Sequence, residues 1–431
     1  MASTYLTRTQ GSATNQKKGT FSFWIKRTAI GSNQRIVTNY NDSNNYGYLR
    51  FNSSDQLQHY VYGGGSTIGH LITERVFRDV SAWYNIILAI DTTESTAADR
   101  IKIYVNGVQE TVFGTNTIPS QNTDHPIFAS GTHYIGRHSS DSHYFDGLMS
   151  HVNCCDGTAL APTVFGSTDS TTGEWKITTS PSLTYGNNGY FILKDGNSVT
   201  DQSGNGNNFT VAGGTLTKTE DNPSNVFATL NTLATDATLS NGNTTAQHST
   251  SGDNYQTSPS TLGMTSGKYY CECKVTADSN YPSLGIATTD SIEATKLESD
   301  WLGETSNSYG YYLDGEIYYN GSVIISSLAT FATNDIVGMA LDLDSTQNTL
   351  KFYKNGTLVH TQNLADTPQG WFFATTNQAT RSSGRSFFNF GNGYFGTTAV
   401  SSAGTNASGN GIFEYDVPTG YTALSTKGLN L

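Results

Sequence analysis

The sequence is poor in charged residues, and this scarcity limits the folds that it can adopt. Only 13% of its 431 residues are Asp, Glu, Lys or Arg, whereas soluble domains average about 25%. Helix surfaces are usually built from charged residues and Ala, while Ser, Thr, Asn and Gly disfavour helices. The 44 glycines, 25 tyrosines and 20 phenylalanines favour strands joined by turns. We therefore predict an all-β protein.

Basic residues and long apolar runs are also scarce, which excludes several function classes. The net charge of -12 repels phosphate backbones, so we expect no nucleic-acid partner. The sequence contains no apolar run of about 18 residues, and its first residues lack the apolar region of a signal peptide. We expect synthesis in a cytoplasm without a signal peptide, and no membrane insertion.

The chain has only four cysteines, in two close pairs. Cys154 and Cys155 are adjacent, and Cys271 and Cys273 are two residues apart. This spacing is not that of a disulfide-stapled secreted domain. We expect four free thiols, two of them buried and two half-exposed.

Two blocks of the sequence share one pattern of strands and turns. In the first block, residues 83–91 and 100–105 alternate like strands and are followed by Asn106-Gly107, a strong hairpin signal. In the second block, residues 336–344 and 350–354 lead to Asn355-Gly356. We predict two β-domains of similar plan, at residues 1–180 and 236–400. A turn-rich connector (181–235) would join them, and a C-terminal extension (401–431) would carry a short strand at 412–415.

Motifs in the first block resemble the laminin-G and pentraxin-like members of the concanavalin A-like lectin superfamily. The resemblance implies a jelly-roll sandwich of two sheets. The motifs that carry it are FSFWIK (21–26), WYNIILAID (83–91), IKIYVNG (101–107), YIGR (134–137) and FDGLMSHV (145–152).

The second block resembles the SPRY domain, which is also a concanavalin A-like sandwich. The matching motifs are GKYYCECKV (267–275), LGIAT (284–288), SYGYYLDGEIYYNG (308–321), DIVGMALDLD (335–344), LKFYKNG (350–356) and FFNFGNGYF (387–395). Other segments are similar to virion proteins of marine tailed bacteriophages, namely 156–166, 187–195, 203–211, 222–231 and 413–424.

Glycoside hydrolysis is the first chemistry to weigh, because some concanavalin A-like sandwiches are glucanases. Those enzymes place their carboxyl groups on one strand as Glu-x-Asp-x-x-Glu, and the sequence has no such triplet. The nearest pattern, Asp342-Leu343-Asp344, lies where a hairpin turn should begin. We therefore expect a protein that is not an enzyme, with a polysaccharide depolymerase as the less favoured alternative.

A run of potential metal ligands lies in the first block. His138, Asp141 and His143 have the right side chains at short spacing, with Asp146 close behind. The spacing matches no known site well. We expect exposed loop residues and no cofactor, and a structural divalent cation remains the alternative.

Sugar binding is the more specific hypothesis, because aromatic rings stack on sugars and lose little conformational entropy when they do so. Trp301 lies between predicted strands, and Tyr309 is nearby, so both are candidate contacts. Alternatively, the segment 308–312 is core, which leaves only Trp301 as a contact, and Trp301 can equally serve to anchor its own loop. Four tyrosines of the first block, at positions 40, 46, 60 and 62, fall in strands, where half should face inward.

These observations predict a non-enzymatic bacteriophage virion protein. The first hypothesis is a tail fibre or fibre-associated component that binds host-surface polysaccharide through lectin-like domains. The alternative is a virion adaptor, decoration or capsid-fibre protein that binds other phage proteins. We expect a homo-oligomer, for which a trimer is the first model because many tail fibres are trimeric. No coiled-coil heptad sets that number.

Overall fold

The computed structural model describes residues 3–140, 142–196, 198–247, 255–276, 282–290, 301–365, 369–378 and 384–430. The chain divides into two compact units, residues 1–218 (unit 1) and 219–431 (unit 2). Strands dominate the described residues, so the all-β prediction is confirmed. Short 3-10 turns lie at Ala97–Asp99, Pro126–Phe128, Pro162–Val164 and Gly428–Asn430. Among the described residues, no helix has the length and apolar character needed to span a membrane.

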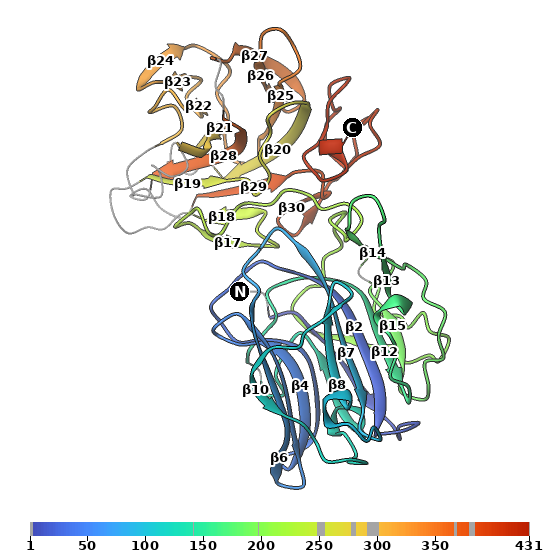
Figure 1. Cartoon of the computed structure of the whole chain (residues 1–431). Coiled ribbons are helices and arrows are strands. Elements are labelled where there is room, and N and C mark those ends of the chain that lie inside the picture. The colour runs from blue at the N-terminus through green and yellow to red at the C-terminus, as the bar shows by residue number, and fades with distance from the viewer. Residues whose placement is uncertain are drawn as a thin grey trace. The chain divides into compact units, whose positions relative to one another are not determined.

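Unit 1 is built from two large antiparallel sheets (Figure 1). The eight-stranded sheet has the order β10 (Phe113–Thr117), β6 (Ser66–Val76), β5 (Gln56–Gly63), β4 (Asn45–Phe51), β3 (Gln34–Asp42), β11 (Gly131–Ile135), β1 (Tyr5–Gln10), β16 (Thr210–Gly213). The six-stranded sheet has the order β15 (Tyr190–Ile192), β12 (Gly147–Asp156), β2 (Lys18–Arg27), β7 (Trp83–Asp91), β8 (Ile101–Val105), β9 (Val108–Gln109). A small sheet adds β13 (Gly166–Thr168) and β14 (Trp175–Ile177).

The core of unit 1 follows from alternation along the strands. In β2, Phe21, Phe23 and Ile25 are fully buried in one hydrophobic cluster. Strand β4 contributes Leu49 and Phe51 to the same cluster. Because neighbouring side chains of a strand point to opposite faces, the residue between Leu49 and Phe51 points away from this cluster.

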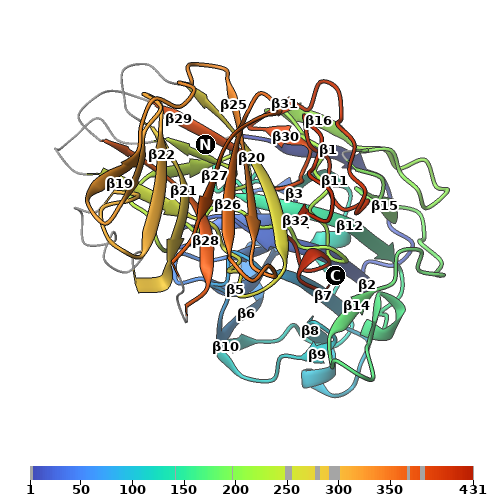
Figure 2. The ribbon, with the colours of Figure 1, turned by 90° about the horizontal axis from the view of Figure 1, so that it is seen from above.

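Unit 2 has the same two-sheet plan (Figure 2). Its eight-stranded sheet comprises β17 (Thr238–Ser240), β18 (Thr245–Gln247), β29 (Arg385–Asn389), β20 (Lys268–Thr276), β25 (Ile336–Asp342), β26 (Thr349–Lys354), β27 (Thr357–Asn363), and β32 (Thr422–Ala423) beside β20. Its six-stranded sheet has the order β19 (Tyr255–Pro259), β28 (Trp371–Gln378), β21 (Ser283–Thr288), β22 (Ser308–Tyr312), β23 (Ile317–Tyr319), β24 (Ser322–Ile325). Strands β30 (Tyr394–Phe395) and β31 (Thr398–Ala399) pair separately.

The predicted connector and C-terminal extension add strands to the two sandwiches. Residues 181–218 belong to unit 1, where β15 pairs with β12 and β16 pairs with β1. The C-terminal segment lies in unit 2, where β32 runs parallel to β20. The strand expected at 412–415 is wrong, because that stretch makes only an isolated bridge between Asn392 and Ile412.

The four cysteines are free, as expected, and all four are buried. The expectation that two of them are half-exposed is therefore wrong. Cys154 and Cys155 alternate along β12, but both faces of that strand are covered there.

Candidate functional site

The predicted contact residue Trp301 lies in a cluster of aromatic rings in unit 2. Its ring is partly exposed and meets Tyr318 and Tyr312 edge to face, with ring centroids 5.0 and 5.8 Å apart. Tyr255 lies 6.2 Å away. Edge-to-face packing holds the ring in place and leaves part of it accessible. Trp301 as a ligand contact stays a prediction.

Tyr309 is not exposed, so that expectation is wrong. Only 2% of the residue is accessible, and its ring stacks on Tyr319 at a centroid distance of 4.4 Å. Its hydroxyl accepts a hydrogen bond from the Ala365 backbone N–H at 3.0 Å. Strand β22 lies between β21 and β23, which buries the whole 308–312 segment, as the alternative reading had it.

The predicted metal ligands His138 and His143 lie close together in unit 1, with ring centroids 5.7 Å apart. Asp141 lies outside the described residues. Burial lowers the pKa of His138 to about 4, and the positive charge of Arg35 acts in the same direction. No group of three His, Cys, Asp or Glu side chains within the described ranges could hold a metal ion. The positive charge of Arg35 disfavours a cation beside these rings, and the structural cation stays the alternative prediction.

A row of tyrosines crosses three neighbouring strands on the outer face of the eight-stranded sheet of unit 1. We call this row the tyrosine face. It consists of Tyr40 on β3, Tyr46 and Tyr48 on β4, and Tyr60 and Tyr62 on β5. The register pairs Tyr40 with Tyr46, Tyr46 with Tyr62, and Tyr48 with Tyr60.

The rings of the tyrosine face stack on one another. Centroids of cross-strand neighbours lie 5.3 to 6.3 Å apart, with interplanar angles of 26 to 29°. Since the strands are about 4.8 Å apart, such rings stand up from the sheet and present edges and hydroxyls. Four of the five rings are partly exposed, and Tyr48 is buried. The result is a rigid surface of apolar edges and hydrogen-bonding groups.

The expectation that half of the tyrosines at 40, 46, 60 and 62 face inward is wrong. Tyr46 and Tyr48 are two residues apart, as are Tyr60 and Tyr62, so each pair shares a face. The inward positions hold Leu49 and other core residues instead. The spacing of two was visible in the sequence, but the register that aligns the strands was not.

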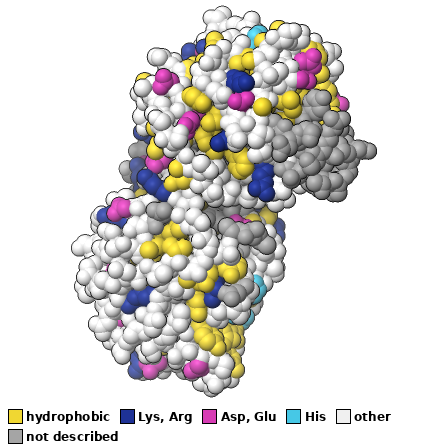
Figure 3. Space-filling view, turned by 180° about the vertical axis from the view of Figure 1, so that it is seen from behind, with side chains coloured by type: hydrophobic (Ala, Val, Ile, Leu, Met, Phe, Trp, Pro, Cys, Tyr) yellow, Lys and Arg dark blue, Asp and Glu magenta, His cyan; other side chains and the backbone are white. Residues whose placement is uncertain are grey.

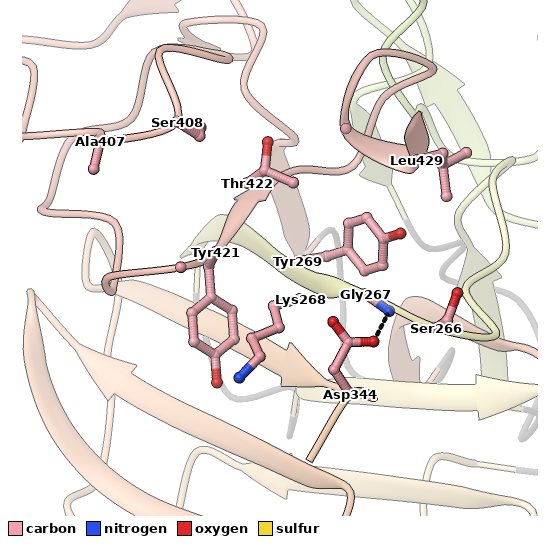
Figure 4. A pocket seen from close by; sticks show the side chains of 12 residues that line it. Ser266, Gly267, Lys268, Tyr269, Asp344, Ala407, Ser408, Tyr421, Thr422 and Leu429 are labelled. Atoms are coloured by element: carbon pink, nitrogen blue, oxygen red, sulfur yellow. Dashed lines mark hydrogen bonds between the residues drawn. The ribbon is translucent and has the colours of Figure 1, made fainter. Parts of the chain in front are cut away.

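A third surface feature is a shallow pocket of about 460 Å³ in unit 2 (Figure 4). Asp344 points into it and accepts a hydrogen bond from the Gly267 backbone N–H at 2.7 Å. Neighbouring Asp342 accepts from the backbone of Asp344 and Ser345 at 3.1 Å and pairs with Lys268 at 2.9 Å. Both carboxylates therefore hold a turn, which is the role expected of this segment.

Comparison with known families decides the classification of both units. Residues 1–164 match the concanavalin A-like lectin/glucanases superfamily, and residues 268–385 match the SPRY domain. The chain is a concanavalin A-like domain followed by a SPRY domain. Both domains have binding-type folds that are not typical of enzymes.

Some solved structures match parts of the chain. The SPRY domain of human HERC1 is 17% identical, with a TM-score of 0.31, over 36% of this chain and 94% of that one. A pentraxin from Limulus polyphemus is 17% identical, with a TM-score of 0.28, over 37% of this chain and 71% of that one. The search of curated proteins gave no match.

Proposed function

We propose that this chain is a non-enzymatic binding protein whose concanavalin A-like domain attaches to cell-surface polysaccharide through the tyrosine face. The observation that carries the proposal is the alignment of five tyrosines on one face of three adjacent strands. Stacked rings lose little conformational entropy on binding, and their edges and hydroxyls complement the C–H groups and hydroxyls of sugars.

We further propose that the protein is part of a tailed-phage virion, as a tail fibre or fibre-associated component made in the host cytoplasm. The resemblance of several segments to phage virion proteins supports this context. In a homo-oligomer, many weak sugar contacts combine into firm attachment, because each additional contact is intramolecular.

A second candidate function is that of a virion adaptor that binds another protein through the SPRY domain. Strand β24 is the edge of its sheet, and Val323 and Ile324 on it are 41% and 37% exposed. An unpaired edge with exposed apolar side chains can accept a strand from a partner.

Binding to whole host cells and to immobilised polysaccharides tests the first proposal. We expect the double variant Tyr46→Ala/Tyr62→Ala to bind about tenfold more weakly, because two ring contacts are lost. Tyr104→Ala is the matched control, since Tyr104 is a partly exposed tyrosine on β8 of the other sheet. Equal binding by the double variant and the control would refute a role for the tyrosine face.

A further inference from the structure

Two arginines lie directly against the tyrosine face, at Tyr48. The guanidinium carbon of Arg35 is 3.2 Å from the centroid of the Tyr48 ring, and that of Arg50 is 5.3 Å away. The register places Arg35 on β3 opposite Arg50 on β4. Like charges opposite each other on adjacent strands repel, so this arrangement costs stability unless something else compensates the charge.

Arg35 is buried, with 4% of the residue exposed. Its Nε and Nη1 atoms have no hydrogen-bond partner in the described part of the chain. Burial lowers the pKa of this guanidinium to about 10. A buried cation without a counter-ion is costly, and its field extends through the low-dielectric protein to the surface above it.

Among the described residues, the accessible groups around Arg35 include no acidic partner that would cancel this field. Arg50 is partly exposed, and its Nε donates to the neutral side-chain oxygen of Gln58 at 2.6 Å. His143 is exposed, and its backbone carbonyl accepts a hydrogen bond from the Arg35 backbone N–H at 2.8 Å, which holds His143 beside the arginines. Across the described ranges, no carboxylate forms an ion pair with Arg35 or Arg50.

This local charge contrasts with the rest of the molecule. The chain has a net charge of -12, and charged side chains are scattered sparsely over the face seen in Figure 3. A pair of arginines beside an aromatic row is therefore a distinct electrostatic feature. The described acidic groups do not neutralise the positive charge of this feature. An anion from a ligand would therefore complement it.

We propose that the polysaccharide bound by the tyrosine face is acidic, and that its anionic groups, carboxylate or sulfate, lie against Arg50 and His143 above the buried Arg35. This inference rests on the proposed function and adds the ligand class. The neutral parts of the sugar would lie on the tyrosine rings, and the anionic substituent would neutralise the arginine pair. Hydrogen bonds between ions are stronger than neutral ones.

Matched pairs of polymers test this inference. We would measure binding of the full chain to polygalacturonate and its methyl ester, and to dextran sulfate and dextran. Wild type should bind the acidic member of at least one pair about tenfold more tightly, and added salt should reduce that preference. The pair that shows the preference distinguishes carboxylate from sulfate.

Single-residue variants test which residues cause the preference for acidic polymers. Arg50→Gln should remove most of the preference for the acidic polymer. Lys17→Gln is the matched control, because it removes the same charge from the turn before β2. Thermal unfolding of each variant shows that the fold is retained.

The possible failures are distinguishable. If acidic and neutral polymers bind equally well, and Tyr46→Ala/Tyr62→Ala weakens that binding about tenfold, the acidic ligand is overturned and the proposed function is kept. If Arg50→Gln still prefers the acidic polymer, the placement of the anion at Arg50 would be overturned. Absence of binding to all four polymers and to host cells would overturn both proposals.

Discussion

At the scale of single residues, the buried carboxylate of Asp55 organises one end of the concanavalin A-like core. It pairs with the fully buried Arg27 at 2.9 Å and with Arg78 at 3.2 Å. It also accepts a hydrogen bond from the Gly31 backbone N–H at 2.7 Å. Arg27 can remain buried as a cation because Asp55 supplies its counter-charge.

Replacing Asp55 by Asn should therefore destabilise the first domain strongly. The change keeps the side-chain shape but leaves Arg27 buried without a negative partner, which costs about 3 kcal/mol or more. Urea unfolding of the full chain measures the effect. Asp42→Asn is the control because Asp42 is exposed and caps a turn. A similar cost for both variants would contradict this account of Asp55.

At the scale of elements, the two domains repeat one hairpin in detail. In the first, the Asn106 side chain accepts from the Asn85 backbone N–H at 2.8 Å, and Asn106 N–H donates to the Asn85 carbonyl at 2.9 Å. In the second, Asn355 makes the same two bonds with Ile336, at 2.9 and 2.8 Å. Both asparagines have positive φ, 50° and 48°. The turn thus fixes the start of the neighbouring strand, β7 or β25.

An aromatic ring from a later segment covers the glycine of each turn. A Cβ added to Gly107 would lie 2.4 Å from the ring of Trp175, and one added to Gly356 would lie 2.7 Å from Tyr415. These rings belong to the β14 strand and to the C-terminal segment. The glycines are required both for their positive φ and for this close approach.

We expect Gly107→Ala and Gly356→Ala each to destabilise its own domain by more than the free energy that Ala needs to adopt a positive φ. Gly31→Ala measures the cost of φ, because Gly31 has φ of +74° and no atom within 4 Å of the added Cβ. That cost is about 1 kcal/mol, and the blocked ring contact should add at least as much again. Thermal unfolding compares the three variants, and equal losses would show that the rings move aside freely.

The hairpins also show how much of the fold follows from sequence. Alternation and Asn-Gly turns are local signals, and they located β2, β7, β8, β25 and β26 to within a few residues. The tyrosine face depends on the register between β3, β4 and β5, which no local signal encodes. Tyr309 shows the same limit, since its burial depends on the neighbours of β22. That Arg35 has no ion pair among the described residues depends on contacts between distant segments, which no local signal encodes.

At the scale of the whole molecule, the two separate cores respond to acid in opposite directions. In the first domain, burial lowers the pKa of His59 to about 4 and that of His133 to about 3. Below pH 6.5 these histidines bind protons in the unfolded chain but remain neutral in the folded domain. The stability that the domain has at neutral pH is therefore lost as the pH falls from about 6.5.

In the SPRY domain, Glu272 has the opposite effect. Its side chain is fully buried on β20 and accepts hydrogen bonds from the backbone N–H groups of Glu414 and Tyr415, each at 2.9 Å. Burial raises its pKa from 4.5 to about 7. Between these values the folded domain holds a proton that the unfolded chain has released. Its contribution to stability is complete below pH 4.5 and is lost as the pH rises through 7.

Scanning calorimetry of the full chain between pH 5 and 7 should therefore show two unfolding transitions that move apart or cross. On acidification the midpoint of the concanavalin A-like domain should fall and that of the SPRY domain should rise. Gly107→Ala and Gly356→Ala assign the transitions, because each lowers one midpoint. In Glu272→Gln the group no longer titrates, so the SPRY midpoint should become nearly independent of pH in this range. A wild-type SPRY midpoint that falls on acidification in parallel with the other would contradict the assignment to Glu272.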